Sequence, residues 1–132
     1  RRSSDLNEFR PLILVAEDDD SNFKLIKAII GKKCDIQWAK NGEEIVALFK
    51  EYGNEAKAIL MDIKMPVMNG LDATKIIRGE NKEIPIIMQT AYAFSSDKEN
   101  AMNAGASEVL VKPITLSILR NTLTKYFPEL VW

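Results

Sequence analysis

The side chains best suited to chemistry in this sequence come directly after short apolar runs. The run LILVA is followed by four consecutive acids that begin with Glu17 and Asp18, and the run AILM is followed by Asp62. Two further apolar runs end in Thr90 and Lys112. Crowded carboxylates repel one another unless a cation joins them, and Mg²⁺ prefers hard oxygen ligands, often with phosphate oxygens beside them. Because lysine is a point charge suited to phosphate, the set indicates Mg²⁺-dependent phosphoryl chemistry.

Each of these residues, taken singly, also has an ordinary structural explanation. Aspartate is favoured at helix N-caps and in first turns, where the helix dipole welcomes negative charge. Thr90 is a strand-favouring residue, and a lysine at a strand end is normally solvated. The chemical interpretation therefore depends on the combination, in which four of five expected strands end in such a residue.

The elements that position these residues follow from a regular alternation of patterns. Continuous apolar runs predict strands covered on both faces, and stretches with a 3.6-residue period predict amphipathic helices. The expected strands cover residues 12–16, 36–39, 58–61, 84–90 and 108–111. The expected helices cover residues 21–30, 42–52, 70–78, 95–104 and 115–127, with Asp20 or Ser21 and Asn41 as N-caps and with Gly31 and Gly53 as stops. The buried helix faces are expected to include Phe23, Leu25, Ile26, Ile29 and Ile30 in the first helix and Leu116, Leu119, Leu123 and Phe127 in the last.

Five strands, each followed by a helix, predict a doubly wound α/β fold with a parallel sheet and helices on both faces. In such folds, ligands bind beyond the carboxyl ends of the strands, where the strand order reverses. If the strand order is 2-1-3-4-5, the strands at 12–16 and 58–61 are neighbours. Glu17 and Asp18 then lie beside Asp62 at one edge of the sheet.

Composition removes several classes of protein. The chain has 132 residues, 18 Lys plus Arg against 19 Asp plus Glu, one Cys and no His. The absence of His excludes a Ser-His-Asp triad, an HExxH metal site and imidazole acid-base catalysis within these residues. A net charge of −1 gives no general attraction to nucleic acid or to an anionic membrane. The lone Cys34 suits a reducing compartment, so we expect a cytoplasmic location.

The chain resembles the receiver domain of two-component response regulators, the CheY-like family with a flavodoxin-like fold. The resemblance covers Leu12 to Phe127 and is carried by LILVAEDDDSN, MDIKMPVMNG, QTA and EVLVKP, in the family's order and spacing. It implies a five-stranded sheet of order 2-1-3-4-5 and a domain that takes a phosphoryl group from a phosphohistidine and switches conformation. The implied chemistry is self-phosphotransfer and autodephosphorylation, without turnover of a separate substrate.

The resemblance also implies a role for each site residue. Asp62 is the expected phosphoacceptor, and Thr90 and Lys112 are expected to contact phosphoryl oxygens. The expected Mg²⁺ ligands are Glu17, Asp18, Asp62 and the backbone carbonyl of Lys64. The Lys112–Pro113 peptide bond is expected to be cis, as is common in the family.

One position departs from the family pattern. Val109 stands three residues before the conserved lysine, where family members often have an aromatic residue that follows the threonine shift. The usual threonine-aromatic switch is therefore in question, and Tyr92 lies near enough to Thr90 in the sequence to take a related role. Our hypothesis is that Tyr92 and Lys64 tune the lifetime of the acyl phosphate, because both flank the path of an attacking water.

Three alternatives to a phosphoacceptor fit parts of the sequence. A phosphatase of the haloacid dehalogenase type needs a second Asp two residues after the nucleophile, and Lys64 occupies that position. Flavodoxin-like capture of FMN or a nucleotide is disfavoured because GxGxxG and GxxxxGK are absent and an acidic edge repels an unaccompanied phosphate. A degenerate receiver used only for protein contacts is disfavoured by the complete set of acids, Thr90 and Lys112.

The expected organisation is a linker or N-terminal arm at residues 1–10 and a receiver domain at residues 11–132. The parent is expected to be a hybrid sensor histidine kinase, on the cytoplasmic side of the membrane if that kinase is a membrane sensor; a stand-alone receiver and a receiver with an effector domain are the alternatives. The expected partner is a kinase dimerisation domain or a histidine phosphotransfer protein, because this chain has no histidine to act as donor. We expect no direct contact with nucleic acid or membrane, and a monomer or a weak phosphorylation-dependent dimer.

Overall fold

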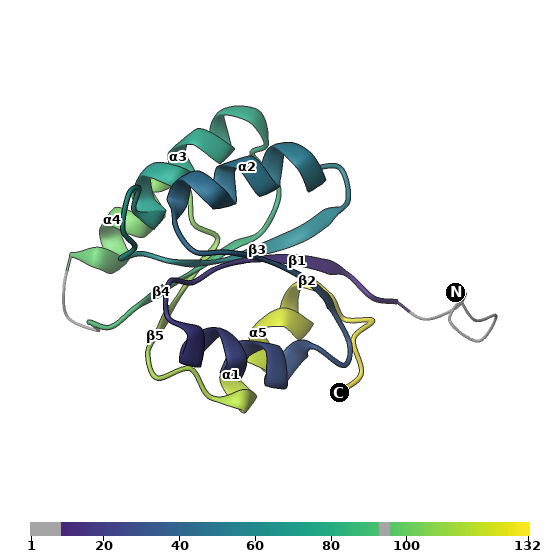
Figure 1. The fold of residues 1–132 in the computed structure, drawn as a ribbon. Helices are drawn as coiled ribbons and strands as arrows, with labels where there is room; N and C mark the ends of the chain where they lie inside the picture. The colour runs from purple at the N-terminus through teal and green to yellow at the C-terminus, as the bar shows by residue number, and fades with distance from the viewer. Residues whose placement is uncertain (1–8, 93–95) are drawn as a thin grey trace.

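The computed structural model describes residues 9–92 and 96–132, and Figure 1 shows their arrangement. The strands are β1 (Leu12–Ala16), β2 (Asp35–Ala39), β3 (Ala56–Asp62), β4 (Ile86–Thr90) and β5 (Glu108–Val111). The helices are α1 (Asp20–Ile30), α2 (Gly42–Tyr52), α3 (Gly70–Glu80), α4 (Asp97–Ala104) and α5 (Leu116–Tyr126). Strand and helix alternate throughout, as the sequence predicts.

The five strands pair in parallel in the order β2-β1-β3-β4-β5. Helices α2, α3 and α4 cover one face of this sheet, and α1 and α5 cover the other (Figure 1). The expected doubly wound α/β fold is confirmed. The chain runs outward from β1 to β2 and then returns to β3, so the order reverses between β1 and β3, and their carboxyl ends flank the crevice.

Each face of the sheet buries its own apolar core. On one face, Leu14 and Met61 pack with residues of α2 and α3, and on the other, Ile13 and Leu60 pack with residues of α1 and α5. Because side chains alternate between the two faces, both faces of β1 and β3 must be apolar. This burial explains the continuous apolar runs that precede the acids.

Two leucines expected on buried helix faces are exposed, which makes that part of the prediction wrong. Leu25 is 47% exposed and Leu116 is 48% exposed. Leu25 lies two residues after the buried Phe23. This spacing turns its side chain about 200° around the helix from Phe23, toward the exposed face. Leu116 is the first residue of α5 and precedes the part of the helix whose Leu119 and Leu123 are buried in the core.

Helix boundaries agree with the expected caps except in α1. Asn41 caps α2 by accepting a hydrogen bond of 2.9 Å from the Glu44 amide, as predicted. The cap of α1 is Asp19, whose carboxylate accepts from the Asn22 amide at 3.1 Å, so the expected caps Asp20 and Ser21 were one or two residues late. The expected start of the fourth helix at Ser95 lies outside the described residues, and the helix is described from Asp97.

Strand β4 begins two residues later than expected. The side-chain carbonyl of Asn81 accepts hydrogen bonds from the Glu83 and Ile84 amides at 2.8 and 3.0 Å. These bonds hold Ile84 in a turn, and Pro85 has no N–H to donate to a ladder. The strand therefore starts at Ile86.

The end of the expected N-terminal arm contacts the domain, although residues 1–8 lie outside the described part of the chain. The Arg10 guanidinium donates hydrogen bonds to the carbonyls of Gly31, Lys32 and Cys34 and pairs with the Asp35 carboxylate at 3.2 Å. The three carbonyls belong to the turn between α1 and β2, and Asp35 is the first residue of β2. Within the described residues, no helix is long and apolar enough to cross a membrane.

Candidate functional site

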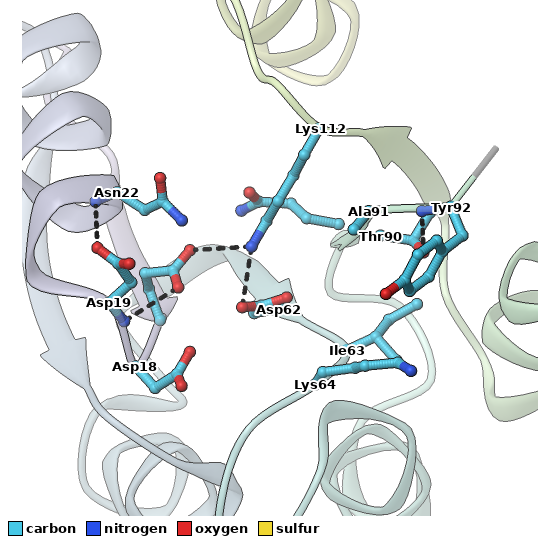
Figure 2. Close-up of a pocket in the computed structure, with 12 residues that line it drawn as sticks. Asp18, Asp19, Asn22, Asp62, Ile63, Lys64, Thr90, Ala91, Tyr92 and Lys112 are labelled. Atoms are coloured by element: carbon cyan, nitrogen blue, oxygen red, sulfur yellow. Dashed lines mark hydrogen bonds and ion pairs between the residues drawn. The ribbon is translucent and has the colours of Figure 1, made fainter.

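The carboxyl ends of four strands enclose one polar cavity of about 260 Å³. Figure 2 shows the side chains that line it. They come from the ends of β1, β3, β4 and β5 and from the start of α1 and include Glu17, Asp18, Asp62, Lys64, Thr90 and Lys112. Every residue that the sequence assigned to the site therefore lies in this cavity wall.

Strand register places the acids together. Ala16 pairs with Met61, so the residues that follow them, Glu17 after the end of β1 and Asp62 in β3, are neighbours. Glu17 is fully buried, Asp62 is 6% exposed, and Asp18 is exposed. Carboxylate oxygens of these three residues lie within 4.8 Å of one another.

The acids fit a divalent cation. Among the described residues, Glu17 Oε1 is the one buried side-chain oxygen or nitrogen that forms no hydrogen bond. Burial, reinforced by the charge of Asp62, raises the pKa of Glu17 from 4.5 to about 7. A buried oxygen without a hydrogen-bond donor, beside two further carboxylates, is an arrangement that a cation with hard oxygen ligands stabilises.

Lys112 links the acids to β5. Its Nζ donates a hydrogen bond of 3.0 Å to Asp62 Oδ2 and lies 3.7 Å from Glu17 Oε1 (Figure 2). Burial opposes the charge of the ammonium, but the hydrogen bond to Asp62 and the neighbouring carboxylates outweigh this effect and raise the pKa of Lys112. The lysine is therefore held as a cation against the carboxylate of Asp62. The Lys112–Pro113 peptide bond is cis, as expected.

In the loop after Asp62, the backbone of Gly70 lies close to the backbone of Asp62 and Ile63. The Gly70 amide donates a hydrogen bond of 2.8 Å to the Ile63 carbonyl, and a Cβ at Gly70 would clash with the Asp62 carbonyl oxygen. Only glycine fits at this point. Its absence of a side chain lets the segment that carries Lys64 return against the end of β3.

Thr90 is held from two directions. It is 2% exposed, its hydroxyl donates a hydrogen bond of 3.0 Å to Asp97 Oδ2, and its oxygen accepts one of 3.1 Å from the Tyr92 amide. The Lys64 ammonium lies 5.1 Å from the centre of the Tyr92 ring, so these two residues also contact each other. Lys64 and Tyr92 thus form one side of the cavity mouth (Figure 2).

Three residues in or beside the cavity were not assigned to the site by sequence analysis. Trp38 donates from its indole nitrogen to the Glu17 carbonyl at 2.8 Å, and its ring stacks on Phe23 with centroids 3.9 Å apart. Gln89 lines the cavity and is 3% exposed, and Asp97 binds Thr90. A polar residue in the buried run at 84–90 was a signal for Gln89, whereas no local pattern distinguished Trp38 or Asp97.

Comparisons with known proteins agree with this geometry. A sequence profile of the response regulator receiver domain matches residues 13–124. Hybrid signal transduction histidine kinase I of Dictyostelium discoideum is 38% identical over an alignment of 129 positions, and the match covers 89% of this chain and 7% of that protein. The chain thus spans a small fraction of the length of such relatives.

Two solved structures are similar in fold and sequence. The receiver domain of a sensor histidine kinase from Pseudomonas aeruginosa, which has a magnesium ion coordinated in its active site cleft, aligns with a TM-score of 0.83, 32% identity and coverage of 91% of this chain and 99% of that chain. The receiver domain of the response regulator Ssk1 from Saccharomyces cerevisiae, in a co-crystal with the histidine phosphotransfer protein Ypd1, aligns with a TM-score of 0.82, 29% identity and coverage of 89% and 88%. With the fold, the acidic crevice and the sequence profile in agreement, this chain belongs to the response regulator receiver domain family and is a receiver domain of a two-component system.

Proposed function

We propose that this receiver domain accepts a phosphoryl group from a phosphohistidine onto the carboxylate of Asp62. The observation that carries the proposal is the 3.0 Å contact between Asp62 Oδ2 and Lys112 Nζ inside a cavity that also holds Glu17 and Asp18. The cavity is open to solvent at the ends of the strands, so a donor side chain can reach Asp62 from outside.

In the proposed reaction, an oxygen of Asp62 attacks phosphorus. A P–O bond forms, the P–N bond of the phosphoramidate breaks, and its electron pair returns to the donor imidazole. The carboxylate is a weak nucleophile that needs positioning, and the hydrogen bond to Lys112 fixes it at the end of β3. Lys112 and the hydroxyl of Thr90 then contact phosphoryl oxygens and stabilise their charge.

Glu17, Asp18 and Asp62, with the backbone carbonyl of Lys64, are the proposed ligands of a Mg²⁺ ion. The ion would supply positive charge between the Asp62 carboxylate and the entering phosphoryl group. Three clustered carboxylates and the unbonded Oε1 of Glu17 support this assignment. The charge of the Glu17 carboxylate is otherwise balanced mainly by Lys112, which is shared with Asp62.

The proposed donor is a histidine phosphotransfer protein or the dimerisation domain of a histidine kinase. The chain has no histidine, so none of these 132 residues can form the phosphohistidine. Relatives of the chain are parts of hybrid histidine kinases, and a similar receiver is crystallised with a phosphotransfer protein, which supports a parent of the hybrid type. The proposed site of action is the cytoplasm, whose reducing environment suits the lone Cys34.

A Mg²⁺-dependent phosphatase of the haloacid dehalogenase type remains disfavoured. Such an enzyme needs a carboxylic acid two residues after its nucleophile to protonate the leaving group. Lys64 occupies that position, and its ammonium contacts the Tyr92 ring. A receiver used only for protein contacts is likewise disfavoured, since it has no need of a cavity that gathers Asp62, Lys112 and the two further acids.

The test is to incubate the domain with a small phosphodonor and Mg²⁺ and to measure protein-bound phosphate that hydroxylamine releases. The wild-type domain is expected to become labelled, and Asp62→Asn and the wild type with chelator are expected to stay unlabelled. Labelling that persists in Asp62→Asn would overturn the assignment of the acceptor.

A further inference from the structure

The hydroxyl of Thr90 already has a partner in this structure. Its proton is directed to Asp97 Oδ2 at 3.0 Å, while its oxygen accepts the Tyr92 amide at 3.1 Å. A hydroxyl carries one proton and therefore donates one full hydrogen bond at a time. If the Thr90 hydroxyl donates to a phosphoryl oxygen, its bond to Asp97 must break.

Asp97 is the first residue of α4, so this bond ties the end of β4 to the beginning of that helix. The helix is otherwise lightly attached. It has eight residues, of which only the small Ala101 and Ala104 are buried, and its N-cap residue Ser96 forms no side-chain capping bond. Ala101 and Ala104 both lie beyond the first turn, so the N-terminal turn of α4 buries no side chain, and the hydrogen bond from Thr90 to the Asp97 carboxylate contributes to holding it against β4.

We propose that Asp97 is a positioning residue that competes with the phosphoryl group on Asp62 for the proton of the Thr90 hydroxyl. The inference rests on the proposed function of Asp62. Phosphorylation then releases the N-terminal turn of α4 from β4. The carboxylate of Asp97 is half-buried, and the helix dipole continues to favour a negative charge in this turn after release.

The competition has a thermodynamic consequence. The Thr90–Asp97 bond must break when the phosphoryl site is filled. The free energy of that bond therefore makes the free energy of phosphoryl binding less favourable. Removing the Asp97 carboxylate is therefore expected to strengthen binding of a phosphoryl mimic, although Asp97 does not line the cavity. A residue that merely stabilises the fold, or that holds Thr90 ready for the phosphoryl group, predicts unchanged or weaker binding.

The test measures the dissociation constant of beryllofluoride, a non-covalent mimic of aspartyl phosphate, at saturating Mg²⁺ by ¹⁹F NMR. Four proteins form a double-mutant cycle: wild type, Asp97→Ala, Thr90→Val and the double variant. We expect Asp97→Ala to bind about tenfold more tightly than wild type, the order of one hydrogen bond to a charged group. In the Thr90→Val background, where no hydroxyl is left to compete for, Asp97→Ala is expected to lose this gain.

Two further variants distinguish loss of the Thr90–Asp97 hydrogen bond from a general effect of charge or of misfolding on beryllofluoride affinity. Asp97→Asn keeps an acceptor but loses the charge, so a smaller gain is expected, and it replaces Asp97→Ala in the cycle if the alanine variant does not fold. Glu99→Gln removes another exposed acid from the same helical turn and is expected to leave the affinity within about twofold. Amide hydrogen exchange supplies an independent readout: in wild type, beryllofluoride should speed exchange in the first turn of α4.

The outcomes are distinguishable from failure of the proposed function. Wild-type protein that does not bind beryllofluoride contradicts the role of Asp62 itself. Wild-type protein that binds, with an Asp97→Ala variant that binds no more tightly, overturns the competition, as does an equal gain from Asp97→Ala in the wild-type and Thr90→Val backgrounds. A gain that depends on the Thr90 hydroxyl supports it.

Discussion

The indole N–H of Trp38 donates a hydrogen bond of 2.8 Å to the backbone carbonyl of Glu17. The Trp38 ring stacks on Phe23 with an interplanar angle of 1°, so the donor is fixed from α1 as well as from β2. Glu17 also receives the Asp19 amide on Oε2 at 3.2 Å. Glu17 is thus oriented through both its backbone and its side chain. Its Oε1 faces Lys112 and Asp62.

Trp38→Phe should weaken Mg²⁺ binding. The phenyl ring retains a surface that can stack on Phe23, and the lost N–H leaves the Glu17 carbonyl free to shift. A net hydrogen bond contributes about 1 kcal/mol, so we expect about a fivefold lower affinity in a Mg²⁺ titration. Trp132→Phe is the matched control, because it loses an indole bond of 2.9 Å to Thr124 at the C-terminal end of α5 and should leave the affinity unchanged. Equal effects in the two variants would show that the Trp38 bond is only structural.

Mg²⁺ affinity should rise with pH through about 7. The pKa of Glu17 is raised from 4.5 to about 7 by burial and by Asp62, so a cation displaces a proton below that pH. In the absence of metal, the folded state binds this proton more tightly than the unfolded state, so the stabilisation is complete below pH 4.5 and is lost as pH rises toward 7. Melting temperatures with and without Mg²⁺ across about pH 4.5 to 8 should therefore diverge with increasing pH. Glu17→Gln should remove most of the divergence; an unchanged divergence would exclude Glu17 as its source.

Tyr92→Ala should shorten the lifetime of the acyl phosphate. Tyr92 is 54% exposed and its ring contacts the Lys64 ammonium, so the two side chains together cover one approach to Asp62. Their removal opens a path for the attacking water, and Lys64→Ala is expected to act in the same direction. Dephosphorylation half-lives after removal of the phosphodonor check this, with Lys57→Ala, an exposed lysine near the start of β3, as the control. Half-lives equal to that of wild type in both variants would count against the hypothesis.

Arg10→Ala should destabilise the domain. The guanidinium has four partners in the turn between α1 and β2 and at the start of β2, including the Lys32 carbonyl at 2.6 Å and the Asp35 carboxylate at 3.2 Å. Its loss is expected to lower the free energy of unfolding by about 1–3 kcal/mol, measured by urea denaturation. Lys32→Ala removes an exposed side chain and keeps the carbonyl that Arg10 binds, so it should change stability little. Similar decreases in the free energy of unfolding in the two variants would mean that the hydrogen bonds and the ion pair of Arg10 do not specifically stabilise the domain.

The parts of the fold that depend on local pattern could be predicted from the sequence. Burial on both faces forces continuous apolar runs into β1 and β3, and the acids that end those runs must then lie at the carboxyl edge. Contacts between residues distant in the sequence could not be predicted this way. The bond from Trp38 to Glu17 joins residues 21 apart, and the exposure of Leu116 depends on which part of α5 packs against the sheet. The link between Thr90 and Asp97 likewise depends on where α4 begins, since the acid alone is typical of an ordinary first-turn residue.

The most direct test of Asp62 as the phosphoacceptor is the intact mass of the domain after incubation with acetyl phosphate and Mg²⁺. The wild-type chain should gain one phosphoryl group, and Asp62→Asn should gain none. Asp20→Asn should gain one phosphoryl group, as wild type does. Asp20 is an exposed acid in the run of four that follows β1, and it lies outside the cavity wall. A phosphoryl group on Asp62→Asn, or none on the folded wild-type protein, would contradict the role of Asp62 as phosphoacceptor.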